Sequence, residues 1–300
     1  MKLFDKNGPI EAIKEETAVT IGVFDGVHRG HHALLHQLST INSQLSTLAV
    51  TLTSHPSFVL GRRASEYWLD DEEEHLKLLF EAGAKYVAVL PFTREVAAMS
   101  ACEMVDWMYE QLNMRCLLLG YDSRFGSKDN DDFGYLPQLA IELGFTLQRG
   151  HPFMVDGEPI SSSRIRQTLL DGAVENTAAL LGRPYSLTGN VTHGRGVGRT
   201  MGFPTANIDL SQTRKMLPFY GVYAVKVDNH IGMANLGTMP TFDIEKPTLE
   251  VHLLDFNGDL YGQQVEVQFL HRIRDIVRFG SPEALQHQLQ QDLEQIKQWS

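Results

Sequence analysis

The chain has 300 residues, of which 43% are hydrophobic and 21% are charged, and its formal net charge is −11. This length exceeds that of most single domains, so we expect two domains, each with enough apolar material for a core. The acidic excess argues against nucleic acid or an anionic membrane as a partner. Cys102 and Cys116 lack the short spacing of a metal site. Because there is also no apolar signal segment and no run of about 18 apolar residues, we expect a cytoplasmic protein.

Residues 20–35, with the sequence TIGVFDGVHRGHHALL, are the most informative stretch of the first half. They predict a buried strand over residues 20–24, a tight turn at Asp25-Gly26, and then the start of a helix. The free N–H groups and the dipole of a helix start form an anion site. The imidazoles of His28 and His31 add donors that can carry charge near neutral pH. The stretch therefore predicts a site for a nucleoside triphosphate.

The other elements of the first half alternate between short apolar strands and amphipathic helices. We expect strands at residues 48–52, 86–92, 116–119 and 145–147, and helical segments at residues 37–44, 70–82, 100–112 and 136–143. Ser100 and Glu103 form a capping box at the start of one helix. Because the strands are continuous apolar runs, the pattern predicts a parallel sheet with helices on both faces.

Ligands of such sheets bind beyond the carboxyl ends of the strands. Two further polar clusters are expected there, at residues 51–57 and 120–126, and a third, ISSSRIR at residues 160–166, opens another helix with serines and arginines. If the clusters converge, they surround a polyphosphate with imidazoles, backbone amides, hydroxyls and guanidinium groups.

Each cluster also has a plainer interpretation. ISSSRIR alone is typical of an ordinary capped helix, and His55, which precedes a proline, could serve only to shape a turn. A zinc site is an alternative for four nearby histidines, although no Cys or carboxylate completes it at typical spacing. These histidines are His28, His31, His32 and His36.

Beyond residue 182 the pattern changes to short alternating strands, and we place the domain boundary between residues 182 and 183. Strands are expected at residues 185–193, 222–227, 230–236, 249–254 and 265–269, with turns rich in Gly, Asn and Asp between them. Ser281 and Pro282 then open a last helix. Its apolar stripe should pack on the strands; the stripe consists of Leu285, Leu289, Leu293 and Ile296.

The predicted fold is therefore α/β. Residues 1–182 form a doubly wound parallel-sheet domain, and residues 183–300 form a small antiparallel β-barrel with a terminal helix.

The polar chemistry of the second half is concentrated in residues 189–208 and at Glu250. The Thr205 hydroxyl and the Asn207 amide could hold a hard cation among phosphates. In the strand expected at residues 249–254, Leu249, Val251 and Leu253 share one face, and Glu250 lies on the other face. Inside a small barrel its carboxylate would suit a general base, whereas an outward-facing Glu is the commoner arrangement. A glycine-rich loop could turn backbone amides toward an anion; it contains Gly194, Arg195, Gly196 and Gly198.

Together these segments resemble the bacterial bifunctional riboflavin kinase/FAD synthetase family over nearly the whole chain. The first half contributes TIGVFDGVHRGHHALL, the His55-Pro56 pair, RFG at residues 124–126, and ISSSRIR. The second half contributes LLGRPY, GRGVGRTMGFPTANI, GVYAVKV, NLGTMPTF, LEVHLLDF and DLYG. GRGVGRTMGFPTANI and LEVHLLDF are highly specific, because many positions match in order.

The resemblance implies two reactions. The C-terminal domain would transfer the γ-phosphoryl group of ATP to the 5′-hydroxyl of riboflavin, giving FMN. The N-terminal domain would transfer AMP from a second ATP to FMN, giving FAD and pyrophosphate. The implied partners are therefore riboflavin, FMN and ATP, and the implied cofactor is the Mg²⁺ that accompanies ATP.

The resemblance also implies roles for residues of the kinase domain. Glu250 is similar to the base that takes the proton of the ribityl hydroxyl, and Thr205 and Asn207 are similar to the Mg²⁺ ligands. A loop would bind the phosphates; its members are Gly194, Arg195, Gly196 and Gly198.

In the N-terminal domain, His28 and His31 are similar to the groups that hold the ATP phosphates and stabilise the developing charge. The leaving pyrophosphate would be bound by Ser162, Ser163 and Arg164. The nucleotide loop would be completed by Gly22, Phe24, Asp25 and Gly30.

The chain departs from the usual family pattern at four positions. Ser54 stands where proline is common and Ser123 where an aromatic residue is common, both near the expected adenylylation site. Ser163 replaces the usual threonine, and Met239 replaces a common arginine. Two alternatives therefore stay open, namely a riboflavin kinase whose adenylyltransferase half is weak or diverged, and a non-catalytic flavin sensor.

Overall fold

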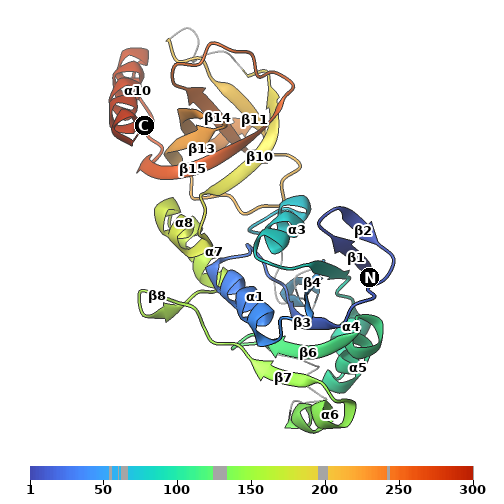
Figure 1. Ribbon diagram of the computed structural model, residues 1–300. Helices are drawn as coiled ribbons and strands as arrows, with labels where there is room; N and C mark the ends of the chain where they lie inside the picture. Colours follow the sequence, from blue (N-terminus) through green and yellow to red (C-terminus); the bar gives the residue numbers. More distant parts are fainter. Residues whose placement is uncertain are drawn as a thin grey trace. The chain divides into compact units, whose positions relative to one another are not determined.

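The computed structural model of the chain describes residues 1–53, 56–59, 61, 67–123, 134–194, 202–241 and 244–299. The chain forms two compact units, Met1–Ser162 and Ser163–Ser300 (Figure 1). In the second unit, helix α8 (Val174–Leu181) lies against strands β10 (Tyr185–Thr192) and β15 (Gln264–Arg274). The domain boundary expected between residues 182 and 183 stays a prediction.

A seven-stranded sheet with the order β2-β1-β5-β4-β3-β6-β7 forms the centre of the first unit. The neighbouring strands from β5 to β7 pair in parallel, as the continuous apolar runs predicted. They are β3 (Thr17–Gly22), β4 (Ser46–Leu52), β5 (Tyr86–Leu90), β6 (Met114–Leu119) and β7 (Thr146–Arg149). A hairpin of β1 (Lys2–Asp5) and β2 (Gly8–Ile10) adds antiparallel to β5. This hairpin was not expected, because its strands are short and contain no continuous apolar run.

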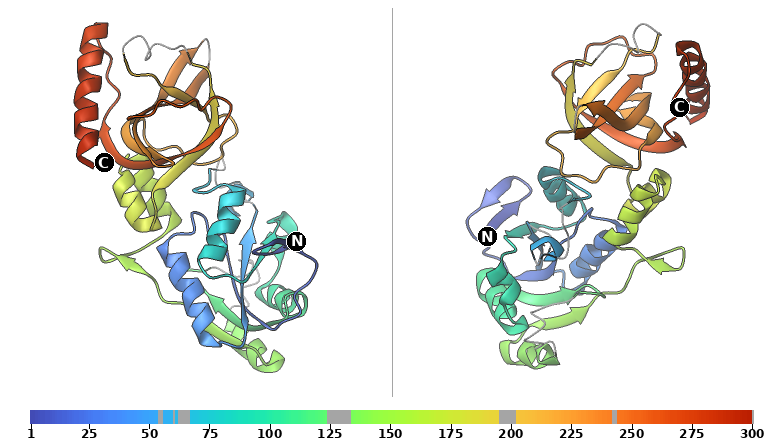
Figure 2. Two further views of the ribbon diagram at one scale, coloured as in Figure 1. Left: turned by 45° about the horizontal axis from the view of Figure 1, so that its top comes forward. Right: turned by 180° about the vertical axis from the view of Figure 1, so that it is seen from behind.

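Helices cover both faces of this sheet, as Figures 1 and 2 show. On one face, Met104 and Met108 of α5 and Leu139 of α6 share a core with Val19 and Val50 of the strands. On the other face, α1 and α3 pack on the strand residues that alternate with these two valines. The helices of the unit are α1 (Arg29–Ile41), α2 (Pro56–Val59), α3 (Glu72–Glu81), α4 (Arg94–Ala98), α5 (Ala101–Gln111) and α6 (Leu136–Leu143). The doubly wound architecture is thereby confirmed.

Several expected boundaries were wrong, among them the ends of the first strand and the first helix. The first strand ends at Gly22 rather than at residue 24, because Phe24 adopts a φ of 53°, which no strand allows. The first helix ends at Ile41 rather than at residue 44, because Asn42 is already extended.

The second unit contains a closed barrel with the strand order β10-β11-β14-β13-β12-β15, seen end-on in Figure 2. Its remaining strands are β11 (Ala206–Asp209), β12 (Gly221–Val227), β13 (His230–Thr241) and β14 (Ile244–Leu253). The predicted barrel is confirmed. Strand β11 was not anticipated, because its four residues lie within a motif that reads as a polar loop.

Helix α10 (Pro282–Ile296) lies outside the barrel (Figure 2) and begins after the N-cap Ser281. Leu293 and Ile296 are buried against Val222 and Met233 of the barrel, with Leu289 at the edge of this cluster. The expected stripe is thus confirmed for three of its four residues, and Leu285 lies outside the cluster.

The described part of the chain also contains α7 (Ser162–Leu170), a hairpin of β8 (Met154–Val155) and β9 (Glu158–Pro159), and a short 3₁₀ turn at Lys297–Trp299. No helix of the described residues is long and apolar enough to cross a membrane.

A buried ion pair fastens α10 to the barrel. The Arg274 guanidinium donates to both carboxylate oxygens of Asp292, at 2.8 to 3.1 Å, and the Asp292 side chain is 2% exposed. Replacing Asp292 with Ala leaves the arginine without its counter-charge, so we expect the free energy of unfolding of this unit to fall by about 3 kcal/mol. Urea denaturation of the full chain measures this change.

The control is Asp275→Ala, which removes the neighbouring pair of Arg272 and Asp275. The Asp275 side chain is 72% exposed, so its loss should cost less than about 1 kcal/mol. Equal effects of the two substitutions would contradict the role given to Asp292.

Candidate functional site

The turn between β3 and α1 adopts an unusual backbone conformation. Phe24, Gly26 and Val27 have φ values of 53°, 80° and 32°. Such values are rare for Phe and Val, so the surrounding structure must hold the turn in place. The buried Phe24 ring folds back over Gly22, where a Cβ would come within 3.3 Å of the ring. Glycine at position 22 therefore permits this reversal of the chain.

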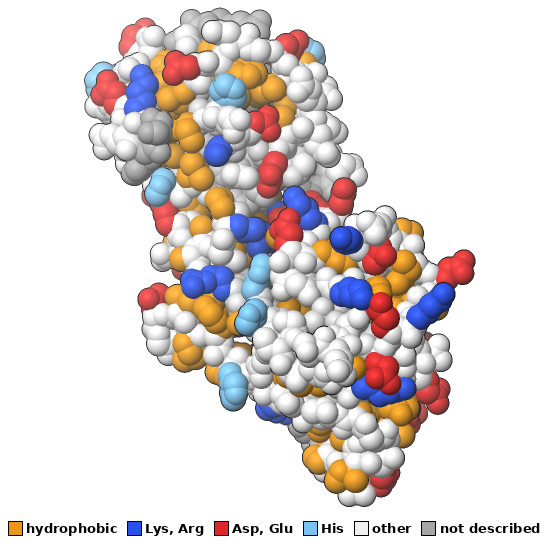
Figure 3. Space-filling model, viewed as in Figure 1, with side chains coloured by type: hydrophobic (Ala, Val, Ile, Leu, Met, Phe, Trp, Pro, Cys, Tyr) orange, Lys and Arg blue, Asp and Glu red, His pale blue; other side chains and the backbone are white. Residues whose placement is uncertain are grey.

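His28 and His31 form a stacked pair at the start of α1. Their ring centroids lie 3.6 Å apart at an interplanar angle of 17°, and the Phe24 ring meets His31 edge-on at 5.2 Å. The His28 backbone N–H donates to Nδ1 of His31 at 3.3 Å, so His31 carries its proton on Nε2. A Cβ at Gly30 would lie 3.1 Å from the His28 ring, so this glycine provides the space for His28. Histidine side chains also gather on the surface over α1 (Figure 3).

His31 is neutral in this arrangement. Burial lowers its pKa well below the usual value for histidine, and the neighbouring His28, His75 and His32 lower it further. The sequence indicated that His31 can carry charge near neutral pH, whereas its burial favours the neutral ring, and sequence spacing does not reveal how deeply a ring is buried.

Asp25 stabilises the turn through hydrogen bonds to its side chain and to its backbone carbonyl. Its side chain is buried, and its Oδ1 accepts a hydrogen bond from the Leu69 backbone N–H at 2.8 Å. Its backbone carbonyl accepts a hydrogen bond from the Ser162 hydroxyl at 3.0 Å, which ties the start of α7 to the turn. Ser163 and Arg164 follow as the next residues of α7, the first exposed and the second half-buried.

In the barrel, Glu250 lies in a row of polar side chains. It pairs directly with Asn207 of β11 and Asn235 of β13, so the three side chains share one face of the sheet. Its strand neighbours Leu249 and Val251 are buried. The face that carries Glu250 also carries Met233, the partner of His252, and Met233 packs against α10 outside the barrel. Glu250 therefore faces outward and is half-buried, which decides between the two alternatives raised by the sequence.

Asn207 lies against Gly194. A Cβ at Gly194 would lie 2.1 Å from Nδ2 of Asn207, so only glycine allows this approach. Gly189 permits an equally close approach of β10 to Asp209 of β11. The loop residues Arg195, Gly196 and Gly198, together with Ser54, His55 and residues 124–126, lie outside the described residues.

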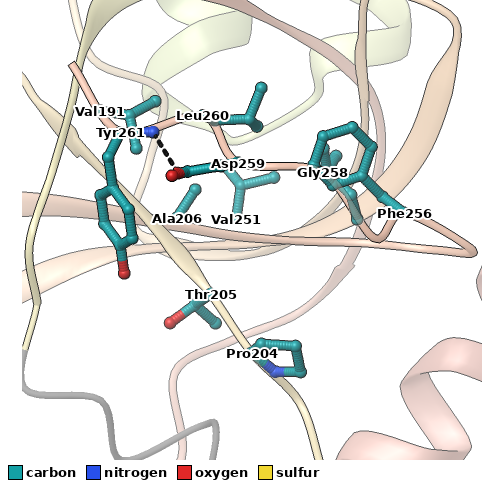
Figure 4. Close-up of a pocket in the computed structure, with 11 residues that line it drawn as sticks. Val191, Pro204, Thr205, Ala206, Val251, Phe256, Gly258, Asp259, Leu260 and Tyr261 are labelled. Carbon is teal, nitrogen blue, oxygen red and sulfur yellow. Dashed lines mark hydrogen bonds between the residues drawn. The ribbon is translucent and has the colours of Figure 1, made fainter. Parts of the chain in front are cut away.

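A cavity lies beside Thr205 at one end of the barrel, with Tyr261 and Phe256 at its opposite sides (Figure 4). Tyr261 stacks on His193 at 4.0 Å, and its backbone N–H donates to Asp259 at 2.9 Å. Most residues that line the cavity have apolar side chains, and polar and apolar atoms contribute about equally to its surface. Its lining comprises Val191, Pro204, Thr205, Ala206, Val251, Leu253, Phe256, Gly258, Asp259, Leu260 and Tyr261.

The described residues contain no group of three or more His, Cys, Asp or Glu side chains that could hold a metal ion. Within the histidine cluster of α1, His28 and His31 stack face to face. The geometry thus gives the zinc alternative no support. Thr205 and Asn207 are instead neutral oxygen donors, which suit a hard cation whose charge is balanced by bound phosphates.

Comparison with known proteins identifies a family for each half of the chain. Residues 10–164 match the family described as FAD synthetase, and residues 181–300 match the family described as riboflavin kinase. The bifunctional riboflavin kinase/FMN adenylyltransferase of Escherichia coli (strain K12) is 37% identical over 290 residues, which cover 94% of this chain and 92% of the relative. The chain belongs to this bifunctional family.

The corresponding protein of Haemophilus influenzae is also 37% identical, over 93% of each chain. A solved structure described as a macrolide-efflux protein from Streptococcus pneumoniae superposes with a TM-score of 0.87 at 32% identity, over 96% of each chain. The whole two-unit fold is therefore shared.

Members of this family carry out both steps of flavin cofactor synthesis, and this chain is such an enzyme. It phosphorylates riboflavin to FMN and transfers AMP from ATP to FMN, which gives FAD. ATP is used with a divalent metal ion in both steps. The reading as a non-catalytic flavin sensor is thereby set aside.

Several contributing residues could not be found from the sequence. His252 donates from Nδ1 to the Pro204 carbonyl at 2.8 Å and so anchors the segment that carries Thr205. Asp70 bonds to Gly26 of the turn before α1 from more than 40 residues away in the chain, and His75 bonds to Asp70. In the sequence they belong to an acidic helix start, with no local signal that distinguishes them.

Gly194→Ala should impair the kinase reaction. The added methyl group overlaps the Asn207 side chain and displaces it, so we expect riboflavin phosphorylation to fall about tenfold to a hundredfold. FMN adenylylation should be unchanged, because the substitution lies in the other unit. Separate assays of FMN and FAD formation measure the two effects.

Gly280→Ala is the matched control, since a Cβ there meets no atom within 4 Å. It should leave both activities intact. A Gly194→Ala enzyme with normal kinase activity would show that Asn207 does not need its observed position.

Proposed function

We propose that the two activities are divided between the two sites described above. The turn with the His28–His31 stack carries adenylyl transfer, and the row of Asn207, Glu250 and Asn235 on the outer face of the barrel carries riboflavin phosphorylation. The observation that supports this division is that the His28–His31 pair lies within residues 10–164, which match FAD synthetase, whereas Asn207, Asn235 and Glu250 lie within residues 181–300, which match riboflavin kinase.

In the kinase reaction, Glu250 takes the proton of the riboflavin 5′-hydroxyl as the hydroxyl oxygen attacks the γ-phosphorus of ATP and ADP leaves. Thr205 and Asn207 would hold Mg²⁺, which when bound neutralises charge on the phosphate oxygens. The close approach of Gly194 to Asn207 supports this assignment. The ATP phosphates lie along the glycine-rich loop, which comprises Gly194, Arg195, Gly196 and Gly198.

In the adenylyl reaction, a phosphate oxygen of FMN attacks the α-phosphorus of ATP, and pyrophosphate leaves. His28 and His31 donate hydrogen bonds to the phosphates, and His31 does so from Nε2. The arriving negative charge favours the protonated form of the rings as charge develops. Gly22, Phe24, Asp25 and Gly30 shape this site, and the pyrophosphate is held by Ser162, Ser163 and Arg164.

We also propose a cytoplasmic location. Cys102 and Cys116 are both free thiols, and burial raises the pKa of Cys116 to about 11, so this thiol is unreactive. Free thiols of this kind are typical of reducing compartments.

Glu250→Gln should lower riboflavin phosphorylation by about a hundredfold or more, because the amide cannot accept the hydroxyl proton. FMN adenylylation should continue. His28→Ala should do the reverse and lower adenylylation by roughly a hundredfold. FMN and FAD are separated by chromatography in assays started from riboflavin or from FMN. Loss of both activities in either variant would contradict the division into two sites.

Thr205→Val removes one proposed ligand of Mg²⁺ while keeping the side-chain shape. We expect a several-fold rise in the Mg²⁺ concentration needed for half-maximal kinase activity, and no change in the Mg²⁺ dependence of adenylylation. Titration of enzyme treated with a chelator measures both values. An unchanged kinase requirement would remove Thr205 from the ligand set.

A further inference from the structure

The strained turn before α1 is tied to a buried carboxylate on a distant segment. Oδ2 of Asp70 accepts a hydrogen bond from the Gly26 backbone N–H at 3.1 Å. In return, Asp25 of the turn accepts one from the Leu69 N–H beside Asp70, at 2.8 Å. The Asp70 side chain is almost fully buried. These reciprocal bonds hold the turn at Asp25 and Gly26.

His75 of α3 connects this carboxylate to the near end of the same turn. Its Nδ1 lies 3.0 Å from Oδ2 of Asp70, and its Nε2 lies 2.8 Å from the hydroxyl of Thr51 at the end of β4. The Thr51 hydroxyl lies 3.2 Å from the Val23 carbonyl oxygen, to which it donates. One chain of hydrogen bonds thus runs from Gly26 through Asp70, His75 and Thr51 to Val23.

Counting protons shows which form of His75 this chain requires. Thr51 has a single hydroxyl proton, and the Val23 carbonyl can only accept a hydrogen bond. If Thr51 donates to Val23, it must accept from Nε2 of His75, so Nε2 carries a proton. The ionised Asp70 likewise accepts from Nδ1. All the bonds form together only when His75 is a doubly protonated imidazolium.

The charges around His75 favour that form. Burial by itself lowers the pKa of His75, but the charge and hydrogen bond of Asp70 together with the charges of Asp25 and Glu74 outweigh it, so the pKa lies above its usual value. Among the described residues, the facing groups are Asp70 and Glu74 from its own segment, Asp25 from the turn, and His31 from α1. His31 is neutral and Thr51 of β4 carries no charge, so neither offsets the nearby carboxylates.

We propose that Asp70 and His75 are positioning residues for adenylyl transfer: the His75 imidazolium joins Asp70 to Thr51 and holds residues 23–26 in the conformation that presents His28 and His31 to the nucleotide. This inference rests on the assignment of His28 and His31 to the adenylyl site. The imidazolium also offsets a carboxylate that would otherwise stand uncompensated close to a bound triphosphate.

This chain of hydrogen bonds has a defined pH dependence. His75 is charged at pH values below its pKa, so the complete chain forms and holds the turn in that range. The chain is lost as the pH rises through a value above about 6.5, the usual pKa of histidine. Adenylylation should therefore fall over that range. The kinase reaction of the same chain uses neither residue and serves as an internal control.

The first experiment compares His75→Leu with His75→Lys in the full-length enzyme. Leucine removes both hydrogen bonds, and kcat/KM for FMN adenylylation should fall about tenfold to a hundredfold, since small displacements of catalytic groups cost this much. Lysine keeps a positive charge and donors for both Asp70 and Thr51. It should restore activity to within a few-fold of the original enzyme. Normal kinase activity shows in each case that the preparation is intact.

The second experiment measures the pH profile of adenylylation relative to that of the kinase. The unmodified enzyme should lose adenylylation as the pH rises through the pKa of His75, whereas His75→Lys should stay level. Asp70→Asn keeps an acceptor for the Gly26 N–H but removes the charge. It should therefore shift the loss to lower pH, an effect that general destabilisation does not produce.

The results distinguish a failure of the positioning role of His75 from a failure of the adenylyl-site assignment. Full adenylylation by His75→Leu, or the same alkaline loss in His75→Lys as in the unmodified enzyme, would overturn the inference. The His28→Ala variant, assayed in parallel, tests the assignment of His28 to the adenylyl site, on which this inference rests. If His28→Ala keeps adenylylation, the site itself is misassigned; if it loses adenylylation while His75→Leu does not, only the positioning role fails.

Discussion

The first unit depends on a reversal of the chain between β3 and α1. Phe24, Gly26 and Val27 adopt positive φ values there, a conformation that costs free energy and persists only when neighbouring groups hold it. Gly22 makes room for the Phe24 ring, and Asp25 is bonded to Leu69 and to Ser162. This backbone conformation and the hydrogen bonds that hold it place the imidazoles of His28 and His31 at a helix start, where phosphate groups bind most favourably.

The second unit meets a different constraint, which is the two-residue period of a β-strand. Leu249 and Val251 fill the barrel, so Glu250 between them must face outward. The same register places Asn207 and Asn235 on either side of the carboxylate. A closed barrel with a packed interior thus supports its reactive groups on its outer face and at one end, where the cavity beside Thr205 lies.

The two reactions need different chemical groups from the protein, and each unit provides the group that its reaction needs. The kinase site needs an acceptor for one proton, and Glu250 provides a carboxylate for it. The adenylyl site needs donors for a polyphosphate, and the imidazoles provide them. Each unit has its own core, so a change in one site can leave the other working. This independence makes each activity a control for its neighbour.

Short-range pattern in the sequence was enough for the α/β class, the parallel sheet, the barrel, the terminal helix and the motifs of both sites, because strand and helix periods are local. The antiparallel hairpin, strand β11, the outward direction of Glu250 and the neutral state of His31 were decided by tertiary structure. Burial and register depend on partners far along the chain. The same reason hid Asp70, which bonds to Gly26 of the turn, and His75, which joins Asp70 to Thr51 of β4.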